Sequence, residues 1–400
     1  MIPRERYMNK IRPFFNKEIV KVLVGMRRCG KSVMLQLIQE ALRQQGVSSE
    51  QFITINFESA KNKELKDAEA LYAFLSERAG QINKKVYIML DEIQEVDEWQ
   101  TCINSLLADM DVDIYITGSN AKLLSGELAT YLAGRYVEIK IYPFSFQEVL
   151  MVEPQADERD LFMRYLQCGG MPFLYSAKLE QENAMTYLTD IYYSVVLKDV
   201  VQRNSIRDTD LLDRIITYVI SNIGAEFSAK SISDYMKSEN RKIAPETVYN
   251  YLQACENAYL LHRVKRQNLI GKTILKTQEK FYLSDQGLRE ALYGFNTRDI
   301  EKVLENIVYM ELLRRGYTIT VGNISGKKVD FVAERRERKL YVQVTYGMAD
   351  EKTREREFSS LLSIPDNYPK YVVSLLDEAD FSRDGIIHKN IREFLKAEND

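Results

Sequence analysis

The stretch GMRRCGKS, residues 25–32, matches the pattern G-x-x-x-x-G-K-[ST] and decides the fold. The apolar run at 19–24 before it predicts a buried strand, and the apolar residues of 32–42 after it recur at three and four, as in a helix. In such a loop the glycines turn backbone N–H groups inward around phosphates, and the helix N-terminus adds partial positive charge. A strand, this loop and a helix in that order predict a phosphate-binding loop.

We expect this loop to bind ATP. Lys31 is predicted to reach the β- and γ-phosphates, and Ser32 is predicted to ligate Mg²⁺. Arg28 has two interpretations, a phosphate contact or a solvated charge. The candidate nucleotide-binding residues are Gly25, Met26, Arg27, Arg28, Cys29, Gly30, Lys31, Ser32 and Val33.

Another apolar strand, expected at 86–90, ends in two carboxylates. Asp91 is predicted to hold Mg²⁺ directly or through water. Successive side chains of a strand point to opposite faces, so Glu92 is free to polarise the attacking water and is the candidate base. Asn56, at the end of a strand expected at 52–57, is predicted to hydrogen-bond Glu92 and restrain it.

A further strand, expected at 114–117, ends in Thr117-Gly118-Ser119-Asn120. A hydroxyl or amide at this place can orient the attacking water or contact the γ-phosphate. Thr117 and Ser119 are therefore candidate catalytic residues, with a plain strand-to-helix turn as the alternative.

Up to about residue 150 short apolar strands alternate with amphipathic helices, which predicts an α/β fold with a parallel sheet covered on both faces. A helix is expected at 65–79 and a last strand at 136–141. Residues 155–205 are predicted to be helical, interrupted by Gly169-Gly170 and Pro172.

Composition excludes several classes of protein. Four hundred residues exceed a single core, so two to four domains are expected, and the net charge of −3 indicates no general affinity for nucleic acid or membranes. No signal peptide and no apolar run of the ~20 residues that span a bilayer is found, so we expect a cytoplasmic protein without a membrane partner. Disulfides and zinc are not expected, because the four cysteines lie far apart: Cys29, Cys102, Cys168 and Cys255.

The second half begins with the order of a winged helix. Helices are expected at 228–237 and from Pro245, followed by two β-like runs at 261–265 and 280–283. In the second helix the residues expected to face the core are Val248, Tyr251, Leu252, Cys255 and Tyr259. The last hundred residues predict a helix at 300–315, strands at 318–321, 329–333 and 340–344, a helix at 351–362 and a strand at 371–375.

The sequence resembles the AAA+ family of P-loop ATPases, in particular a prokaryotic branch that joins the ATPase to a C-terminal domain of unknown function. The matching stretches are GMRRCGKS (25–32), IMLDEIQ (88–94) followed by Trp99, YITGSNAKLLS (115–125), GRYVEIKIYPFSFQEVL (134–150), CGGMP (168–172), LENIVYMELLRRGY (304–317) and KKVDFV (327–332). The resemblance implies an ATPase core at 1–150, a helical lid at 151–205, a winged helix at 206–290 and a PD-(D/E)xK nuclease-like domain at 295–400. Arg135 falls where such ATPases can carry an arginine finger, although a salt bridge at the sheet edge is an equal alternative. Assembly into a homo-oligomer stays open.

The nuclease-like site departs from its family pattern. Glu305 and Asp330 match two of the expected acids, but the (D/E)-x-K element is Gln343-Val344-Thr345. A neutral oxygen and a hydroxyl replace a metal-binding carboxylate and a lysine, so we expect an inactive scaffold.

Two functions compete for the second half. Residues 237–280 hold nine basic residues against four acids, a balance of +5, which favours weak and sequence-tolerant contact with duplex DNA. Lys265, Arg266, Lys272 and Lys276 are expected to contact phosphates from the wing. The second helix exposes Glu246, Thr247, Asn250, Gln253 and Glu256, with no basic residue to recognise bases. The alternative is an ATP-gated platform for protein partners, without nucleic acid.

Overall fold

The computed structural model describes residues 2–124, 132, 134–271, 273–348, 351–375 and 380–397. Ser125 and Lys272, both named above, lie outside the described residues, and so does the side chain of Lys276. The chain forms two compact units, Met1–Tyr142 with Asn257–Tyr259, and Pro143–Glu256 with Leu260–Asp400. The first unit therefore ends before residue 150, where the sequence placed the end of the ATPase core.

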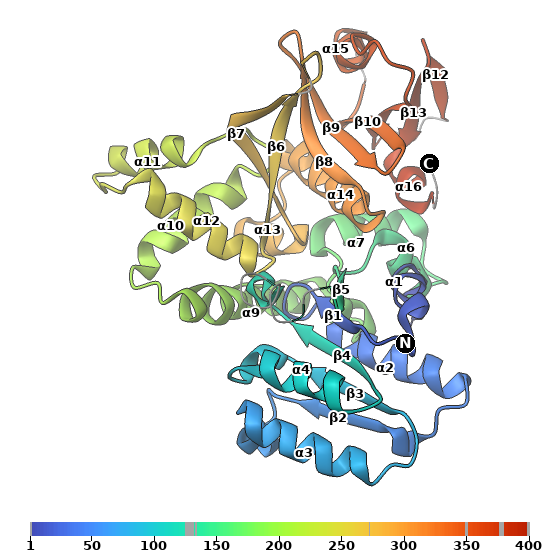
Figure 1. The fold of residues 1–400 in the computed structure, drawn as a ribbon. Helices are drawn as coiled ribbons and strands as arrows, with labels where there is room; N and C mark the ends of the chain where they lie inside the picture. The colour runs from blue at the N-terminus through green and yellow to red at the C-terminus, as the bar shows by residue number, and fades with distance from the viewer. Residues whose placement is uncertain are drawn as a thin grey trace. The chain divides into compact units, whose positions relative to one another are not determined.

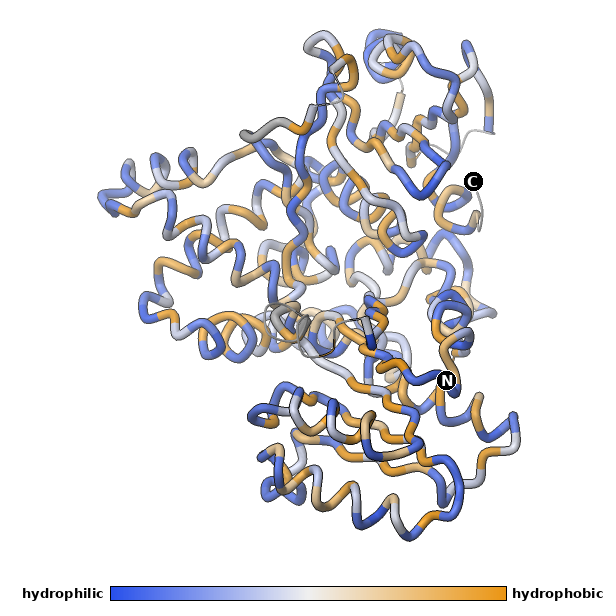
Figure 2. The backbone as a smooth tube through the Cα atoms, in the orientation of Figure 1, coloured by the Kyte–Doolittle hydropathy of each residue, from blue (hydrophilic) through white to orange (hydrophobic). Residues whose placement is uncertain are grey.

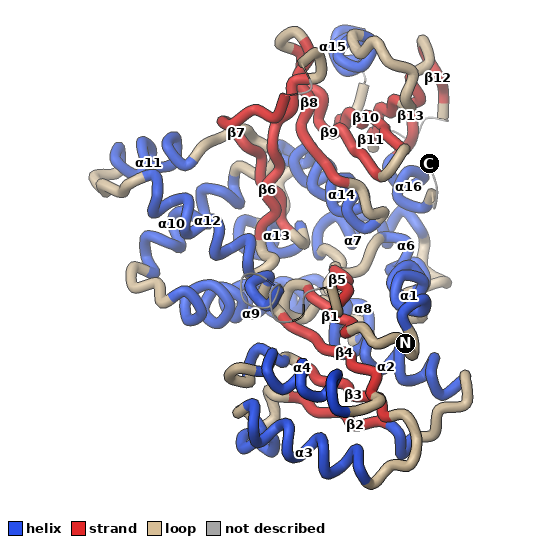
Figure 3. The backbone as a smooth tube through the Cα atoms, viewed as in Figure 1, coloured by secondary structure: helices blue, strands red, loops and turns tan. Residues whose placement is uncertain are grey.

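The first unit is built on a five-stranded parallel sheet of order β2-β3-β4-β1-β5 (Figures 1 and 3). The strands are β1 (Val20–Val24), β2 (Phe52–Asn56), β3 (Val86–Asp91), β4 (Val112–Gly118) and β5 (Tyr136–Lys140). The three inner strands, β1, β3 and β4, are buried on both faces, which is typical of parallel sheets, whereas the edge strands β2 and β5 are buried only in part. Figure 2 shows these strands as hydrophobic segments among more polar helices. The predicted α/β fold with a parallel sheet is confirmed.

Helices cover both faces of this sheet. They are α1 (Glu5–Ile11), α2 (Lys31–Gln44), α3 (Ala68–Gly80) and α4 (Trp99–Asp109). One core joins apolar residues of α1 and α2, such as Met8 and Ile38, to Leu23, Met89 and Tyr115 of the strands. Helices α3 and α4 pack against each other. The strand residues whose side chains point away from α1 and α2 are buried as well.

A buried ion pair links two neighbouring strands of the sheet. Lys21 of β1 contacts Asp113 of β4, and both side chains are fully buried. Asp113 also accepts hydrogen bonds from the backbone N–H of Asn16 at 2.9 Å and from the Tyr115 hydroxyl at 2.9 Å. Burial disfavours the charged form of Lys21 and lowers its pKa, although the attraction of Asp113 favours the charged form and raises the pKa in part.

The second unit begins with helices. They are α6 (Phe146–Val152), α7 (Glu158–Cys168), α8 (Pro172–Ser176), α9 (Gln181–Ser194) with a π-helical continuation (Val195–Gln202), α10 (Thr209–Ser221), α11 (Ala229–Ser238), α12 (Pro245–Asn257), α13 (Gln286–Tyr293), α14 (Ile300–Arg314), α15 (Glu351–Leu362) and α16 (Ile391–Lys396). None of these helices, nor any other described helix, is long and apolar enough to cross a membrane.

An eight-stranded sheet of order β12-β13-β11-β10-β9-β8-β6-β7 completes this unit. Its strands are β6 (Leu261–Asn268), β7 (Thr273–Leu283), β8 (Thr318–Ile324), β9 (Lys327–Arg335), β10 (Arg338–Thr345), β11 (Lys370–Ser374), β12 (Phe381–Arg383) and β13 (Ile386–Asn390). The two β-like runs that were predicted as a short ribbon are β6 and β7. Both strands are longer than expected and belong to this larger sheet. β6 pairs with β7 on one side and, through Arg266–Asn268, in parallel with β8 on the other.

The glycines of the CGG stretch close a tight contact within the second unit. Asp285, just before α13, accepts hydrogen bonds from the backbone N–H groups of Gly170 at 2.7 Å and Gly287 at 2.9 Å. Gly169 has φ +74°, and a Cβ there would stand 1.7 Å from Oδ1 of Asp285. No side chain fits at this position, which is the physical reason for a glycine.

Candidate functional site

The loop at 25–30 turns the chain from β1 into α2, and both of its glycines occupy positions that disfavour a side chain. A Cβ on Gly25 would stand 2.1 Å from the carbonyl oxygen of Ile141. Gly30 has φ +103°, which favours glycine, and α2 begins at the next residue. The predicted strand–loop–helix order is thus present, with the loop at the carboxyl end of a central strand.

Lys31 is buried and turns back over the loop. Its ammonium donates to the carbonyl oxygens of Gly25 at 3.1 Å and Met26 at 3.3 Å, and lies 3.2 Å from Oε1 of Glu92. Burial disfavours the charge, but the attraction of Glu92 outweighs it, so the pKa of Lys31 is raised. Two residues that the sequence predicted for one site are therefore in direct contact.

Asp91 ends β3 beside the loop. Its carboxylate accepts hydrogen bonds from the Thr117 hydroxyl at 2.6 Å and from the Asn56 amide at 3.0 Å. Burial raises the pKa of Asp91, while hydrogen bonds from Thr117 and Ser32 oppose the rise. The expectation that Asn56 restrains Glu92 is wrong. Asn56 stands opposite Asp91 in the parallel register of β2 and β3, so it contacts Asp91 instead.

Glu92 adopts a left-handed backbone with φ 57° and ψ 52°, which directs its side chain differently from that of Asp91. Its N–H donates to the Thr117 hydroxyl at 2.9 Å, so one hydroxyl contacts both acidic residues. One carboxylate oxygen faces Lys31, and the other accepts a hydrogen bond from Nε2 of Gln94. Burial opposes ionisation of Glu92, but Lys31 and Gln94 outweigh it and lower its pKa.

Gln94 is a site residue that the sequence reasoning missed, although it lies in the stretch IMLDEIQ. It belongs to a 3-10 turn (Ile93–Glu95) directly after Glu92. Besides its contact with Glu92, its Nε2 lies 3.4 Å from the hydroxyl of Ser119, which is fully buried at the end of β4. Of the two predicted hydroxyls, Thr117 contacts Asp91 and the backbone of Glu92 directly, and Ser119 is connected to Glu92 through Gln94.

The remaining predicted residues differ in exposure and in place, and Arg135 lies beside Val20 at the amino ends of β5 and β1, at the opposite end of the sheet from the loop. Arg27 is buried and pairs with Glu58 at 2.5 Å, whereas Arg28 is exposed with φ +68°. Met26 and Cys29 are buried, and Val33 is exposed. Arg135 is exposed just before the edge strand β5, and within the described ranges its guanidinium makes no ion pair, so the alternative of a sheet-edge salt bridge is not seen.

The donor atoms suit a hard cation. Ser32 offers a hydroxyl and Asp91 a carboxylate, and the two are hydrogen-bonded to each other. Mg²⁺ prefers oxygen ligands and is usually held by one or two protein groups together with phosphate and water oxygens. The described residues contain no cluster of three or more acidic, cysteine or histidine side chains that would hold a metal without such help.

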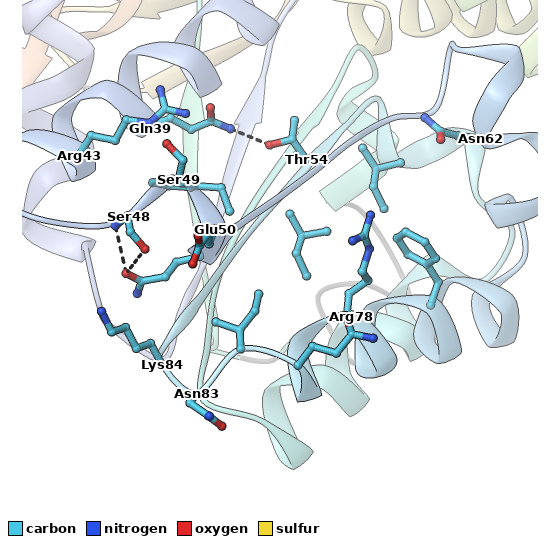
Figure 4. Close-up of a pocket in the computed structure, with 17 residues that line it drawn as sticks. Gln39, Arg43, Ser48, Ser49, Glu50, Thr54, Asn62, Arg78, Asn83 and Lys84 are labelled. Carbon is cyan, nitrogen blue, oxygen red and sulfur yellow. Dashed lines mark hydrogen bonds between the residues drawn. The ribbon is translucent and has the colours of Figure 1, made fainter.

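A hollow of about 990 Å³ lies along the free edge of β2, between α2 and α3 (Figure 4). Gln39 of α2 crosses it and donates to the Thr54 hydroxyl at 2.7 Å. None of the lining residues belongs to the loop at 25–32 or to the pair Asp91 and Glu92. This hollow is therefore separate from the candidate nucleotide site.

The residues that the sequence assigned to a nuclease-like site form their own buried cluster in the second unit. Lys280 of β7 lies 2.7 Å from Oε1 of Glu305 and 3.4 Å from Oδ1 of Asp330, and the Tyr282 hydroxyl also donates to Glu305. The N–H of Val344 donates to Asp330 at 3.0 Å. Burial raises the pKa of Glu305 to about 7, although the positive charge of Lys280 lowers it in part. A lysine ammonium thus contacts both acids that the sequence assigned to a metal.

Several basic residues of 237–280 are already paired with acids. Arg263 pairs with Glu256, and Arg241 pairs with Asp210. Arg266 is buried and lies 3.4 Å from Glu226, so the expectation that it contacts phosphates is wrong. Glu256, expected on the exposed face of α12, is half-buried against Arg263. The basic side chains that are exposed and form no ion pair among the described residues are Lys237, Lys242 and Lys265.

Comparison with protein families gives two matches. Residues 17–150 match an AAA domain, and residues 159–299 match a domain of unknown function (DUF8612). The AAA match spans the five-stranded sheet and every residue of the candidate nucleotide site.

Relatives match over nearly the whole chain. An uncharacterized protein of Haemophilus influenzae is 40% identical over 378 residues, covering 94% of this chain and 93% of that protein. An uncharacterized protein of Methanocaldococcus jannaschii is 31% identical, covering 85% of this chain and 77% of that protein. Among solved structures, a Walker-type ATPase of Pyrococcus abyssi has a TM-score of 0.47 at 14% identity, covering 73% of this chain and 95% of that one.

Proposed function

Because this chain carries an AAA domain and belongs to one family with the Haemophilus influenzae protein that is 40% identical to it, we propose that it is a Mg²⁺-dependent ATPase. One observation carries the proposal: Lys31, Asp91 and Glu92 lie together beside the glycine loop. The ammonium of Lys31 is 3.2 Å from the carboxylate of Glu92.

Each side chain has a distinct role in this proposal. Lys31 binds the β- and γ-phosphates, and the backbone N–H groups of 25–32 surround them. Ser32 and Asp91 would hold Mg²⁺, which would neutralise charge on the phosphates. Glu92 accepts the proton of the attacking water, and the Thr117 hydroxyl orients the Asp91 carboxylate and fixes the backbone of Glu92. Arg135, exposed and without an ion pair in the described part of the chain, is available to a neighbouring subunit as an arginine finger.

Phosphate release by the purified chain tests the proposal. We expect hydrolysis of ATP that stops when EDTA removes Mg²⁺. Lys31→Ala should abolish tight nucleotide binding in a calorimetric titration, whereas Lys66→Ala should leave binding unchanged. Lys66 is a matched control, since it also pairs with a glutamate, Glu95 at 3.4 Å, but is outside the loop. Wild-type hydrolysis by Lys31→Ala would refute the proposal.

The finer part of the proposal is that nucleotide state controls weak contact with duplex DNA by the second half of the chain. Among the described basic side chains of 237–280, those left for this contact after the internal ion pairs are subtracted are Lys237, Lys242 and Lys265. Each phosphate neutralised contributes a log–log salt slope of about −0.9, so three contacts predict about −2.7. Changing these three lysines to glutamate should flatten the slope and leave basal ATPase unaltered.

An ATP-gated protein platform is the competing function. The pairing of Arg241, Arg263, Arg266 and Lys280 with acids favours it, because those charges are no longer available to phosphates. The protein platform would be favoured if the chain does not bind duplex DNA at low salt. It would also be favoured if changing the three lysines to glutamate leaves DNA binding unaltered.

A further inference from the structure

The carboxylate of Glu92 is held by two partners from opposite directions. Oε1 faces the ammonium of Lys31 at 3.2 Å, and Oε2 accepts from Nε2 of Gln94. The proposed role of Lys31 requires its ammonium to move to phosphate oxygens, so this ion pair must weaken when ATP binds. Gln94 is then the side-chain partner that stays with Glu92.

The orientation of the Gln94 amide is determined by its surroundings. Nε2 points to the carboxylate and lies 3.4 Å from the Ser119 hydroxyl, while Oε1 is buried with no hydrogen-bond partner among the described residues. In the flipped amide two oxygens would face each other, because an ionised carboxylate only accepts hydrogen bonds. An ionised Glu92 therefore requires the orientation that is observed.

Packing at the end of β4 keeps the amide in place. A Cβ on Gly118 would stand 2.8 Å from Oε1 of Gln94. Gly118 therefore leaves the space that the carboxamide occupies, between Glu92 and Ser119. The turn Ile93–Glu95 fixes the backbone of Gln94 next to the left-handed Glu92.

From these contacts we infer that Gln94 is a positioning residue for hydrolysis, whose amide keeps the Glu92 carboxylate in place after Lys31 has moved to the phosphates. The inference rests on the proposed function, since it takes Glu92 as the base. Gln94 acts through Glu92 and does not itself transfer a proton.

Two variants separate this role from a merely structural one. Gln94→Glu keeps the shape but removes the donor, and Gln94→Leu removes all hydrogen bonding. A displaced base costs on the order of a hundredfold in rate, so we expect kcat to fall about 10- to 100-fold with KM within about twofold. The matched control is Gln39→Glu, which makes the same change at the Thr54 contact of Figure 4 and should keep wild-type kinetics.

The split between kcat and KM provides the readout that a structural role would not produce. A positioning role lowers kcat selectively, because Lys31 and the loop at 25–32 still bind the nucleotide. A fall in thermal stability and ATP affinity of both Gln94 variants, without a selective fall in kcat, would overturn the inference.

A double variant separates failure of this inference from failure of the proposed function. Glu92→Gln combined with Gln94→Leu should be no slower than Glu92→Gln alone, because both act through one carboxylate. Additive losses would overturn the positioning role. If Glu92→Gln alone turns over ATP like the wild type, the base itself is wrong; if it stalls while both Gln94 variants are unaffected, only the inference on Gln94 is wrong.

Discussion

Replacing Glu92 by glutamine should tighten ATP binding as well as stall its hydrolysis. The ammonium of Lys31 is paired with Glu92 at 3.2 Å, and the two side chains are only 3% and 10% exposed. Lys31 must leave this pair before it can bind phosphates. Glutamine keeps the shape of the side chain but removes the charge that holds the ammonium back.

The magnitude follows from the kind of contact. A hydrogen bond to a charged group contributes about 1.5–3 kcal/mol, and burial leaves this pair little screened by water. Because about 1.4 kcal/mol corresponds to a tenfold change in affinity, Glu92→Gln should bind ATP roughly 10- to 100-fold more tightly. Loss of a general base lowers the rate by roughly 10²- to 10⁴-fold.

Calorimetric titration with Mg-ATP and a phosphate-release assay measure the two effects separately. Glu95→Gln is the matched control, because it removes the same charge three residues further on, where Glu95 contacts Lys66 at 3.4 Å and is 37% exposed. That control should bind and hydrolyse ATP like the wild type. Unchanged affinity with stalled turnover would refute the argument on the ion pair, and wild-type turnover would refute the role of Glu92 as the base.

Three further predictions concern the rest of the chain. The purified protein should leave duplex DNA intact with Mg²⁺ or Mn²⁺ on a gel, because Gln343 and Thr345 replace an acid and a lysine and Lys280 contacts Glu305 and Asp330; cleavage that disappears in Asp330→Ala would contradict this. Gly169→Ala should lower stability by roughly 2–4 kcal/mol in thermal unfolding, since it adds backbone strain and a Cβ 1.7 Å from Asp285, whereas Gly80→Ala, with nothing within 4 Å, should not. Asp113→Asn should cost about 3–5 kcal/mol by leaving Lys21 buried without its partner, whereas the loss for Asp111→Asn, at a 74% exposed carboxylate, should be below about 1 kcal/mol.

The parts of the candidate nucleotide site that are formed by residues close together in the sequence could be predicted. The glycine loop, Lys31 and the pair Asp91 and Glu92 follow strands whose apolar runs are visible, and parallel strands bring their carboxyl ends to one edge. The partner of Asn56 could not be predicted, because it depends on the register between β2 and β3. Gln94 was missed because a glutamine in a turn has no distinctive pattern, and its contact with the carboxylate depends on the turn Ile93–Glu95 that follows the left-handed Glu92.

The basic stretch of the second half shows why a local count of charge overestimates contact with phosphates. The count of +5 for residues 237–280 includes only acids within that window. In the fold, Arg241, Arg266 and Lys280 contact acids outside it, namely Asp210, Glu226, Glu305 and Asp330. Pairing of β6 with β8 brings the strand of Arg266 beside residues more than fifty positions away, which no window of sequence can anticipate. A cation that is buried and paired releases no counterion on DNA binding, so the salt slope should follow the exposed lysines rather than the total charge.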